Sequence, residues 1–219
     1  MPVLWMVLLF WSYPHRAPAD EASDREYKIK AAFVYNFMKF VEGGRFGPAD
    51  GKARANADPN QTIRVGVLGT APAKDAFVEL TGKLVKDRPV RVYRFKGLAE
   101  LKDEDGKVPQ QHPALEEIRK CHVLFICPSE RPCLLRILPD LQRDGILTVG
   151  DVPDFLEAGG IINLLVEDKK VRFEINLAAA ARAKLQIRSS LLRLAARTVE
   201  HDQLERQNDD GKQTGSDKP

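Results

Sequence analysis

The chain has 219 residues, 43% of them hydrophobic, and its 34 Lys and Arg residues against 31 Asp and Glu residues give a net charge of +3. This apolar fraction is enough for a packed core and excludes a globally disordered chain, and the length suits one domain. So small a basic excess is not typical of a nucleic-acid-binding protein, which needs a concentrated basic face.

The first residues predict export. Val3 to Trp11 is an uncharged apolar run, about half the ~20 residues that a membrane-spanning helix needs. Small residues at Ala17 and Ala19 fit a cleavage site before Asp20. We therefore expect residues 1–19 to be a cleaved signal peptide. Because no Lys or Arg precedes the apolar run, an uncleaved anchor is the alternative.

The following residues alternate between helical and extended patterns. Ser23 and Glu26 predict a capping box at the start of a helix that runs to about Val41. The next patterns, in chain order, predict a strand over 63–68, a helix over 73–84, a strand over 89–95, a short helix over 114–120, a strand over 122–127, a helix over 131–142, a strand over 146–149 and a helical turn over 154–158.

The last third of the chain predicts a hairpin and a helix. Two strands, over 161–166 and 171–175, are joined by the turn sequence Glu167-Asp-Lys-Lys170. A long helix is expected from Asn176 to about Glu200, and residues 201–219 are polar and predict a disordered tail. We therefore expect a single layered α/β domain over residues 23–200, with a mixed, mainly parallel sheet flanked by helices and an antiparallel hairpin near the C-terminus.

Motifs of catalytic, cofactor and metal sites are not found in the sequence. Gly66-Val-Leu-Gly69 fits neither a dinucleotide-binding nor a phosphate-binding loop. The four histidines lack the spacing of metal ligands, and the serines lack a nucleophile elbow. Asp151 follows a strand, where α/β proteins place ligands, but it is a lone carboxylate. We expect no catalytic residue, no metal and no cofactor.

Four polar residues near the C-terminus are candidates for binding a ligand or a partner. Arg172, Glu174 and Asn176 alternate along one face of a strand, which is either a solvated edge or the wall of a groove. Arg188 falls within the apolar arc of the expected last helix. Either its long stem carries the charge out to solvent, or its guanidinium binds an anion or a partner carboxylate.

The three cysteines allow one local disulfide. Cys121 and Cys127 stand at the two ends of one strand, too far apart to be bridged. Cys127 and Cys133 flank a loop that could double back, so their pairing is the predicted disulfide. The alternative is that all three are small buried hydrophobic residues.

Several sequence blocks resemble, in the same order, those of YfiR-like periplasmic proteins. The resemblance covers residues 26–198, and the blocks are Glu26–Phe33, Asn36–Phe40, Ile63–Gly69, Cys121–Ile126, Ser129-Glu130, Ile146–Asp151, Gly159–Leu164, Val171–Leu177 and Ala183–Ala195.

This resemblance implies a regulator rather than an enzyme. YfiR-like proteins lie in the periplasm, tend to form homodimers and act on the periplasmic sensor portion of an inner-membrane diguanylate cyclase. They restrain its production of cyclic di-GMP and so affect biofilm formation. The alternative is an envelope protein that binds a small ligand and serves a sensor histidine kinase or an uptake system. A pocket that holds Arg172, Asn176 or Arg188 would favour that alternative.

Overall fold

The structure is a computed structural model of the chain and describes residues 18–47, 62–73 and 75–200. The predicted signal peptide and the predicted tail at residues 201–219 lie almost wholly outside the described residues. The elements are, in chain order, α1 (Pro18–Phe40), β1 (Val41–Gly43), η1 (Gly44–Phe46), β2 (Ile63–Leu68), η2 (Val78–Leu80), β3 (Leu84–Val85), β4 (Arg88–Phe95), η3 (Leu98–Glu100), α2 (Leu115–Ile118), β5 (Val123–Ile126), η4 (Pro128–Cys133), α3 (Leu134–Ile137), η5 (Pro139–Leu141), β6 (Leu147–Gly150), β7 (Ile162–Glu167), β8 (Lys170–Asn176), α4 (Leu177–Arg182), β9 (Leu185–Ile187), α5 (Ser189–Leu192) and β10 (Arg197–Val199).

An eight-stranded sheet forms the centre of the fold, with strand order β10-β8-β7-β6-β5-β2-β4-β3. Neighbouring strands in the run β7-β6-β5-β2-β4 are parallel, and so are β10 and β8. The β7–β8 and β3–β4 pairs are antiparallel. The predicted mainly parallel sheet with an antiparallel hairpin near the C-terminus is therefore confirmed. A separate small sheet joins β1 to β9 in antiparallel fashion.

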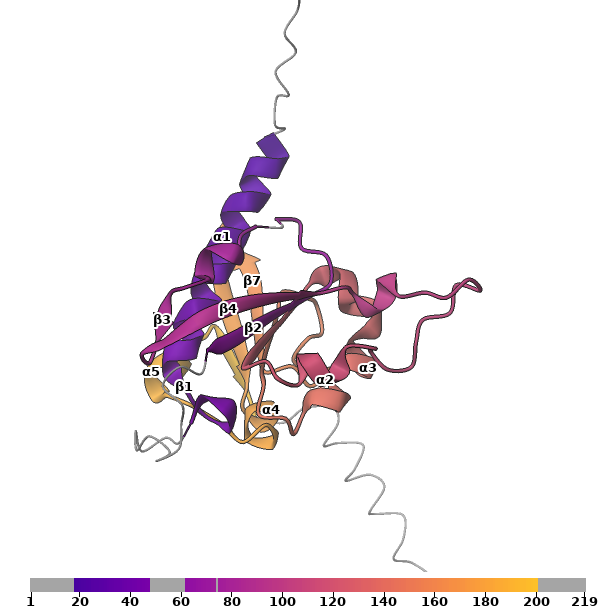
Figure 1. The fold of residues 1–219 in the computed structure, drawn as a ribbon. Helices are drawn as coiled ribbons and strands as arrows, with labels where there is room; N and C mark the ends of the chain where they lie inside the picture. Colours follow the sequence, from indigo (N-terminus) through magenta and orange to yellow (C-terminus); the bar gives the residue numbers. More distant parts are fainter. Residues whose placement is uncertain (1–17, 48–61, 74, 201–219) are drawn as a thin grey trace, which may run out of the picture.

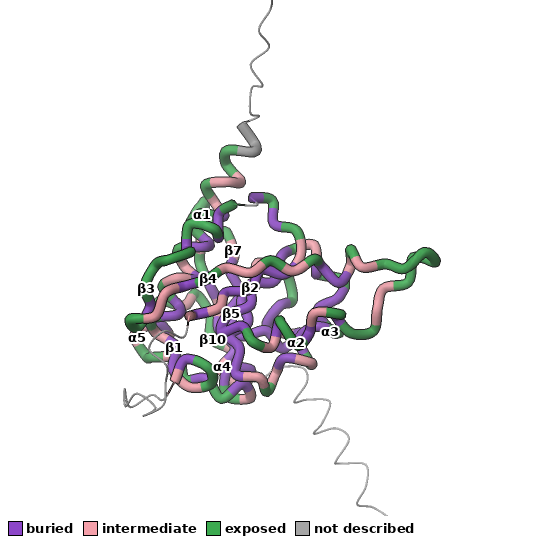
Figure 2. The backbone as a smooth tube through the Cα atoms, in the orientation of Figure 1, coloured by how far each residue is buried: buried purple, intermediate pink, exposed green. Residues whose placement is uncertain are grey.

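Each face of the sheet buries its own hydrophobic cluster. On one face α1 packs through residues such as Val34, Phe37 and Met38, which are at most 1% exposed. On the other face lie α2, α3 and the short helices beside them. The residues of β5 alternate between the clusters, with Phe125 on the α1 side and Leu124 on the other. A strand covered on both faces is apolar throughout, which is why β5 is continuously buried (Figure 2).

The β7–β8 hairpin closes through a two-residue loop. Glu167 pairs with Lys170, and the loop residues Asp168 and Lys169 have φ values of 49° and 61°. Two consecutive residues in the left-handed region form a type I′ turn, whose twist matches that of the two strands. The hairpin predicted from the sequence is confirmed.

The expected long helix from Asn176 to Glu200 is wrong. The segment holds two short helices, α4 and α5, and two short strands, β9 and β10. After α4 the chain turns through Lys184, whose φ is 55°, and β9 then pairs with β1. Gly43 allows this close approach, because a Cβ at that position would lie 2.4 Å from the carbonyl oxygen of Lys184. Pairing with a distant strand therefore overrides the local helical pattern.

Three other helical predictions are also corrected. In the predicted helix over 73–84, residues 75–82 form turns around the short helix η2, and Leu84 begins β3. Residues 131–142 form the broken series η4, α3 and η5. Helix α1 begins at Pro18, so Ser23 lies inside the helix and is not its N-cap. Among the described helices none combines the length and the apolar character required to cross a membrane.

Candidate functional site

Polar residues lie at the carboxyl ends of the parallel strands, where α/β proteins bind their ligands. Chain order reverses between β2 and β5, because the chain passes from β2 to β4 on one side and returns to β5 on the other. Ligands of open α/β sheets bind at such a reversal, outside the carboxyl ends of the strands. The segments that leave β2, β5 and β6 here carry Thr70, Glu130 and Asp151.

Asp151 is the centre of a buried charged cluster that joins α1 to the end of β6. Its Oδ2 accepts hydrogen bonds from Tyr27 Oη at 2.6 Å and from Lys30 Nζ at 2.7 Å. Lys30 also forms an ion pair with Glu26 at 2.5 Å. The side chains of Lys30 and Asp151 are only 6% and 3% exposed. Asp151 therefore holds the middle of α1 against the sheet.

The environment of this cluster changes the pKa of two groups. Burial raises the pKa of Asp151, although the Lys30 ammonium opposes the rise. Burial, and then the neighbouring Asp151 carboxylate, raise the pKa of Tyr27 above its ordinary value. The second carboxylate oxygen, Oδ1 of Asp151, is buried and has no hydrogen-bond partner among the described residues. Because Lys30 and Tyr27 both bind the Asp151 carboxylate, its role is to join α1 to β6 rather than to act as a general acid.

Glu130 occupies the reversal point itself. Its side chain is fully buried, and its Oε2 accepts a hydrogen bond of 2.7 Å from the amide of Leu98. Its Oε1 accepts one of 2.9 Å from Ser129 Oγ, which in turn accepts one of 3.0 Å from the amide of Thr70. Gly97 makes room for the carboxylate, because a Cβ there would lie 1.9 Å from Oε1. The protein's own carboxylate thus fills the place where related architectures hold an anionic ligand.

The four binding candidates named from the sequence do not form one site. Glu174 is bound by the guanidinium of Arg197 at 2.7 and 3.1 Å, and Arg172 makes an exposed ion pair of 3.4 Å with Glu167. Asn176 is buried and is the N-cap of α4. Its Oδ1 accepts a hydrogen bond of 2.8 Å from the amide of Ala179.

Arg188 lies apart from the other candidates, in the loop between β9 and α5. Its Nε donates a hydrogen bond of 2.6 Å to Oε1 of Glu42, and Nη2 contacts the same oxygen. Its amide donates to the carbonyl of Phe40 at 3.0 Å. The guanidinium binds a carboxylate, which is one of the two alternatives expected from the sequence. The carboxylate belongs to Glu42 of the same chain, and the contact joins β1 to the end of β9.

The three cysteines are free and buried in the structure. Cys127 belongs to the cluster on the α1 side of the sheet and Cys133 to the cluster on the opposite side. Since the sheet separates these thiols, the predicted Cys127–Cys133 disulfide is not formed in the structure. Burial raises the pKa of Cys121 to about 11 and raises those of Cys127 and Cys133 as well. Thiols with raised pKa values are poor nucleophiles.

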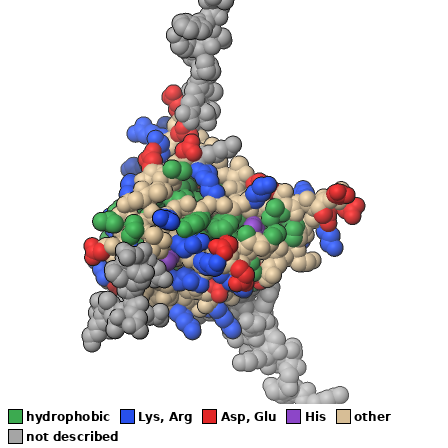
Figure 3. Space-filling view, in the orientation of Figure 1, with side chains coloured by type: hydrophobic (Ala, Val, Ile, Leu, Met, Phe, Trp, Pro, Cys, Tyr) green, Lys and Arg blue, Asp and Glu red, His purple; other side chains and the backbone are tan. Residues whose placement is uncertain are grey.

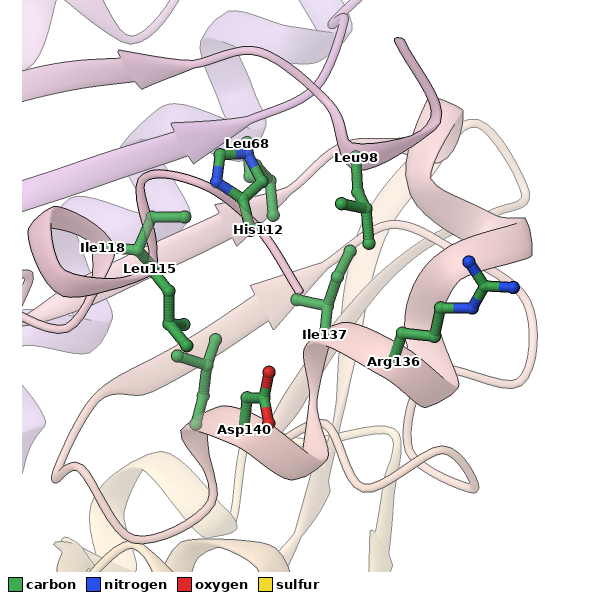
Figure 4. A pocket seen from close by; sticks show the side chains of 9 residues that line it. Leu68, Leu98, His112, Leu115, Ile118, Arg136, Ile137 and Asp140 are labelled. Atoms are coloured by element: carbon green, nitrogen blue, oxygen red, sulfur yellow. The ribbon is translucent and has the colours of Figure 1, made fainter. Parts of the chain in front are cut away.

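A shallow pocket lies on the face covered by α2 and α3 (Figure 4). Its walls are apolar, and His112, Arg136 and Asp140 stand around it. His112 is already engaged, because its Nε2 donates to the carbonyl of Lys96 at 2.9 Å and its Nδ1 accepts from the amide of Ala114 at 3.0 Å. The pocket has a volume of about 260 Å³, open solvent included, which is below that of most small-molecule sites.

A basic cluster that no sequence motif indicates surrounds His122 at the amino end of the sheet. His122 Nδ1 accepts a hydrogen bond of 3.1 Å from the amide of Arg64, and Nε2 lies 2.8 Å from Nη2 of Arg88. Burial, and then the charges of Arg88, Arg45 and Arg64, lower the pKa of His122 to about 3. The imidazole is therefore neutral at physiological pH. Among the described residues no group of His, Cys, Asp or Glu side chains could hold a metal ion.

Comparison with solved structures places the fold among known ones. A conserved domain protein from Vibrio cholerae O1 biovar El Tor N16961 superposes with a TM-score of 0.52 at 12% sequence identity, over 78% of this chain and 60% of that chain. The chain thus spans less than two thirds of that protein, and the likeness concerns the fold alone. The ABC domain from Streptococcus pneumonia, in complex with L-Trp, gives a TM-score of 0.46 at 11% identity, over 62% of this chain and 55% of that chain.

No curated protein matches the chain. The family comparison, in contrast, matches most of it: residues 27–196 fit the YfiR/HmsC-like family, from Tyr27 in the Asp151 cluster to the residue before β10. This match confirms the resemblance seen in the sequence blocks. The chain belongs to the YfiR/HmsC-like family, a family of periplasmic regulators of cyclic di-GMP signalling.

Proposed function

We propose that this protein is exported to the periplasm, binds the periplasmic part of an inner-membrane diguanylate cyclase and restrains its synthesis of cyclic di-GMP. The observation that carries the proposal is the family match over residues 27–196. The protein acts by binding and catalyses no reaction itself. Restraint requires only that it binds one state of the cyclase more tightly than the other.

The geometry of the polar residues supports a binding role. Glu130 and Asp151 stand where an α/β enzyme places reactive groups, yet groups of the chain itself bind both. Such buried carboxylates, bound by groups of the chain itself, fix the arrangement of strands and helices. The same residues therefore give a rigid body whose exposed surface is available to a partner.

The small-ligand alternative would be favoured by a pocket around Arg172, Asn176 or Arg188. The pocket of Figure 4 is lined by none of these residues. A second shallow pocket, bordered by Leu138, Thr148 and Ala183, is not lined by them either. Neither pocket lends support to a ligand receptor built on those side chains.

The proposal is tested in the bacterium that encodes the chain. Deletion of the gene should raise cellular cyclic di-GMP, and expression of the full chain should lower it again. A chain without residues 1–19 should accumulate in the cytoplasm and fail to lower the cyclic di-GMP level, because it cannot meet the periplasmic part of its partner. An unchanged cyclic di-GMP level in the deletion strain would contradict the proposal. Sedimentation of the purified protein tests whether it also forms the homodimer that the family resemblance implies.

A further inference from the structure

One edge of the central sheet is largely unpaired. β4 has eight residues, but its outer neighbour β3 has only two, and they pair only with the first two residues of β4. Beyond Val90 no described strand lies on the outer side of β4 (Figure 1). A row of unpaired main-chain groups at a sheet edge is a template for a further strand.

The hydrogen bonds at the two ends of β4 show which main-chain groups point outward. The amide of Val90 donates to the carbonyl of Lys83, and the carbonyl of Val90 accepts from the amide of Gly82, both at 2.9 Å on the β3 side. The carbonyl of Phe95 accepts from the amide of Gly69 at 3.1 Å, on the β2 side. Since main-chain groups alternate along a strand, Val92 and Arg94 point outward, while Arg91 and Tyr93 pair with β2. Neither Val92 nor Arg94 has a backbone partner on that outer side among the described residues.

This edge is strongly basic. Residues 83–96 contain a single acidic residue, Asp87, and six basic ones: Lys83, Lys86, Arg88, Arg91, Arg94 and Lys96. Lys86 donates to the carbonyl of Val41 and Arg88 contacts His122, so the other four, all exposed, carry the charge of the edge. Arg91 is exposed, and the ion pair of Arg94 with Asp75 is long, at 3.8 Å, with Asp75 97% exposed. An exposed pair of that length neutralises little charge. Arg91 and Arg94, three residues apart, lie on opposite faces of the sheet.

Apolar side chains accompany the basic ones. Val78 and Leu84 are 48% and 58% exposed, and Val92 and Tyr93 are half-buried. Figure 3 shows hydrophobic side chains in a band across the face that β3 and β4 present, with Lys and Arg side chains beside them. A strand added here would therefore contact apolar surface as well as main-chain groups.

The basic charge of the β4 edge favours an acidic partner strand over a second copy of the chain. A second copy of the chain would bring the same basic strand to the edge, and like charges on facing strands are destabilising. An acidic strand meets no such repulsion. We infer that the free edge of β4 adds an extended, acidic segment of the partner protein as a further strand, which pairs with the main chain of Val92 and Arg94 and places carboxylates beside Arg91 and Arg94. This inference rests on the proposed function, because it names the surface through which the regulator holds its partner.

Two kinds of variant separate the backbone contribution from the charge contribution. Val92→Pro removes an outward amide and leaves the pairing of Arg91 and Tyr93 with β2, and Val92→Ala is its matched control. The double variant Arg91→Glu with Arg94→Glu reverses the charge of the edge. Its control is Arg143→Glu, at an exposed arginine between η5 and β6, away from the edge.

Each variant is expressed as the full chain in the deletion strain, and cellular cyclic di-GMP is measured together with the amount and melting temperature of the purified protein. Val92→Pro and the charge-reversed variant should leave cyclic di-GMP at the level of the deletion strain, whereas Val92→Ala and Arg143→Glu should lower it as the wild type does. The charge-reversed variant alters only exposed side chains and should keep the wild-type melting temperature. It therefore tests whether the β4 edge is the docking surface even if Val92→Pro folds poorly.

Other outcomes would overturn the inference. If the wild type lowers cyclic di-GMP and both edge variants do so equally, the edge is not the docking surface, although the proposed function stands. If the wild type has no effect, the proposed function falls and this inference with it. If charge reversal changes the sedimentation of the protein but not cyclic di-GMP, a second copy is the occupant. A last outcome concerns lipid. If the charge-reversed variant neither lowers cyclic di-GMP nor binds phosphatidylglycerol vesicles, whereas Val92→Pro does both, the edge binds a lipid surface instead.

Discussion

Tyr27 on α1 donates a hydrogen bond of 2.6 Å to Asp151, which follows 124 residues later in the chain. Lys30 donates to the same carboxylate oxygen at 2.7 Å. The first turns of α1 extend beyond the sheet (Figure 1), and these two bonds tie the helix to the carboxyl end of β6. The start of the YfiR/HmsC-like domain is thus tied to a residue in its last third.

Replacement of Asp151 by Ala should destabilise the protein by about 3 kcal/mol, because it leaves the buried Lys30 ammonium with the partly exposed Glu26 as its only carboxylate. The double variant Lys30→Met with Asp151→Leu should recover most of this loss, since it removes both charges. Urea unfolding of both variants measures the difference. An Asp151→Ala variant as stable as the wild type would show that the cluster does not hold α1.

Gly97→Ala should also destabilise the protein, by roughly 2 kcal/mol, because the new methyl group meets the carboxylate of Glu130. The backbone itself allows alanine, since φ and ψ at Gly97 are −65° and 147°. Glu130→Ala alone should destabilise by leaving the Leu98 amide without its partner. The two substitutions together should cost less than the sum of the single effects, and simple additivity would contradict direct contact between these residues.

Acidification should destabilise the fold through His122. Its folded pKa of about 3 lies below the ordinary value, so the unfolded chain binds the proton first as the pH falls. The free energy of unfolding should drop by roughly 2 kcal/mol more in the wild type than in His122→Gln between about pH 7 and pH 5. The raised pKa of Asp151 acts in the opposite direction, since the folded carboxyl protonates first, but it acts equally in both proteins and cancels in the comparison. Equal slopes for the two proteins would contradict the assignment.

The three buried thiols should resist alkylation in the folded protein. In denaturant without reductant all three should react with iodoacetamide, as counted by mass spectrometry, because the structure contains no disulfide. If Cys121 alone reacts until reductant is added, the Cys127–Cys133 pairing predicted from the sequence is present and the two segments have moved from the arrangement described above.

The sequence predicts the strands well where their signals are local. β5 is a continuous apolar run, and Asp168-Lys169 sits between two alternating segments, so the parallel sheet and its hairpin follow from residue pattern alone. The segment after Asn176 lacks Gly and Pro, so nothing local marks the left-handed Lys184 or the pairing of β9 with β1. Propensity favours one long helix there, and tertiary pairing decides otherwise.

The charged clusters are harder to predict for the same reason. Glu42 meets Arg188 across 146 residues, and Glu130 meets the Leu98 amide across 32. In the sequence Glu42, Glu130 and Arg188 each look like an ordinary exposed charge. The sequence leaves carboxylate binding by Arg188 as one of two alternatives, and it does not locate the carboxylate, which belongs to Glu42.

The most direct test of the regulator function measures cyclic di-GMP formation from GTP by detergent-solubilised membranes of the deletion strain. The exported protein, purified from the periplasmic fraction, is added at increasing concentration, with the charge-reversed Arg91→Glu and Arg94→Glu variant in parallel. The rate should fall in a saturable way with the wild type and fall little or not at all with the variant. A rate that stays constant at every concentration of the wild-type protein would contradict the regulator function.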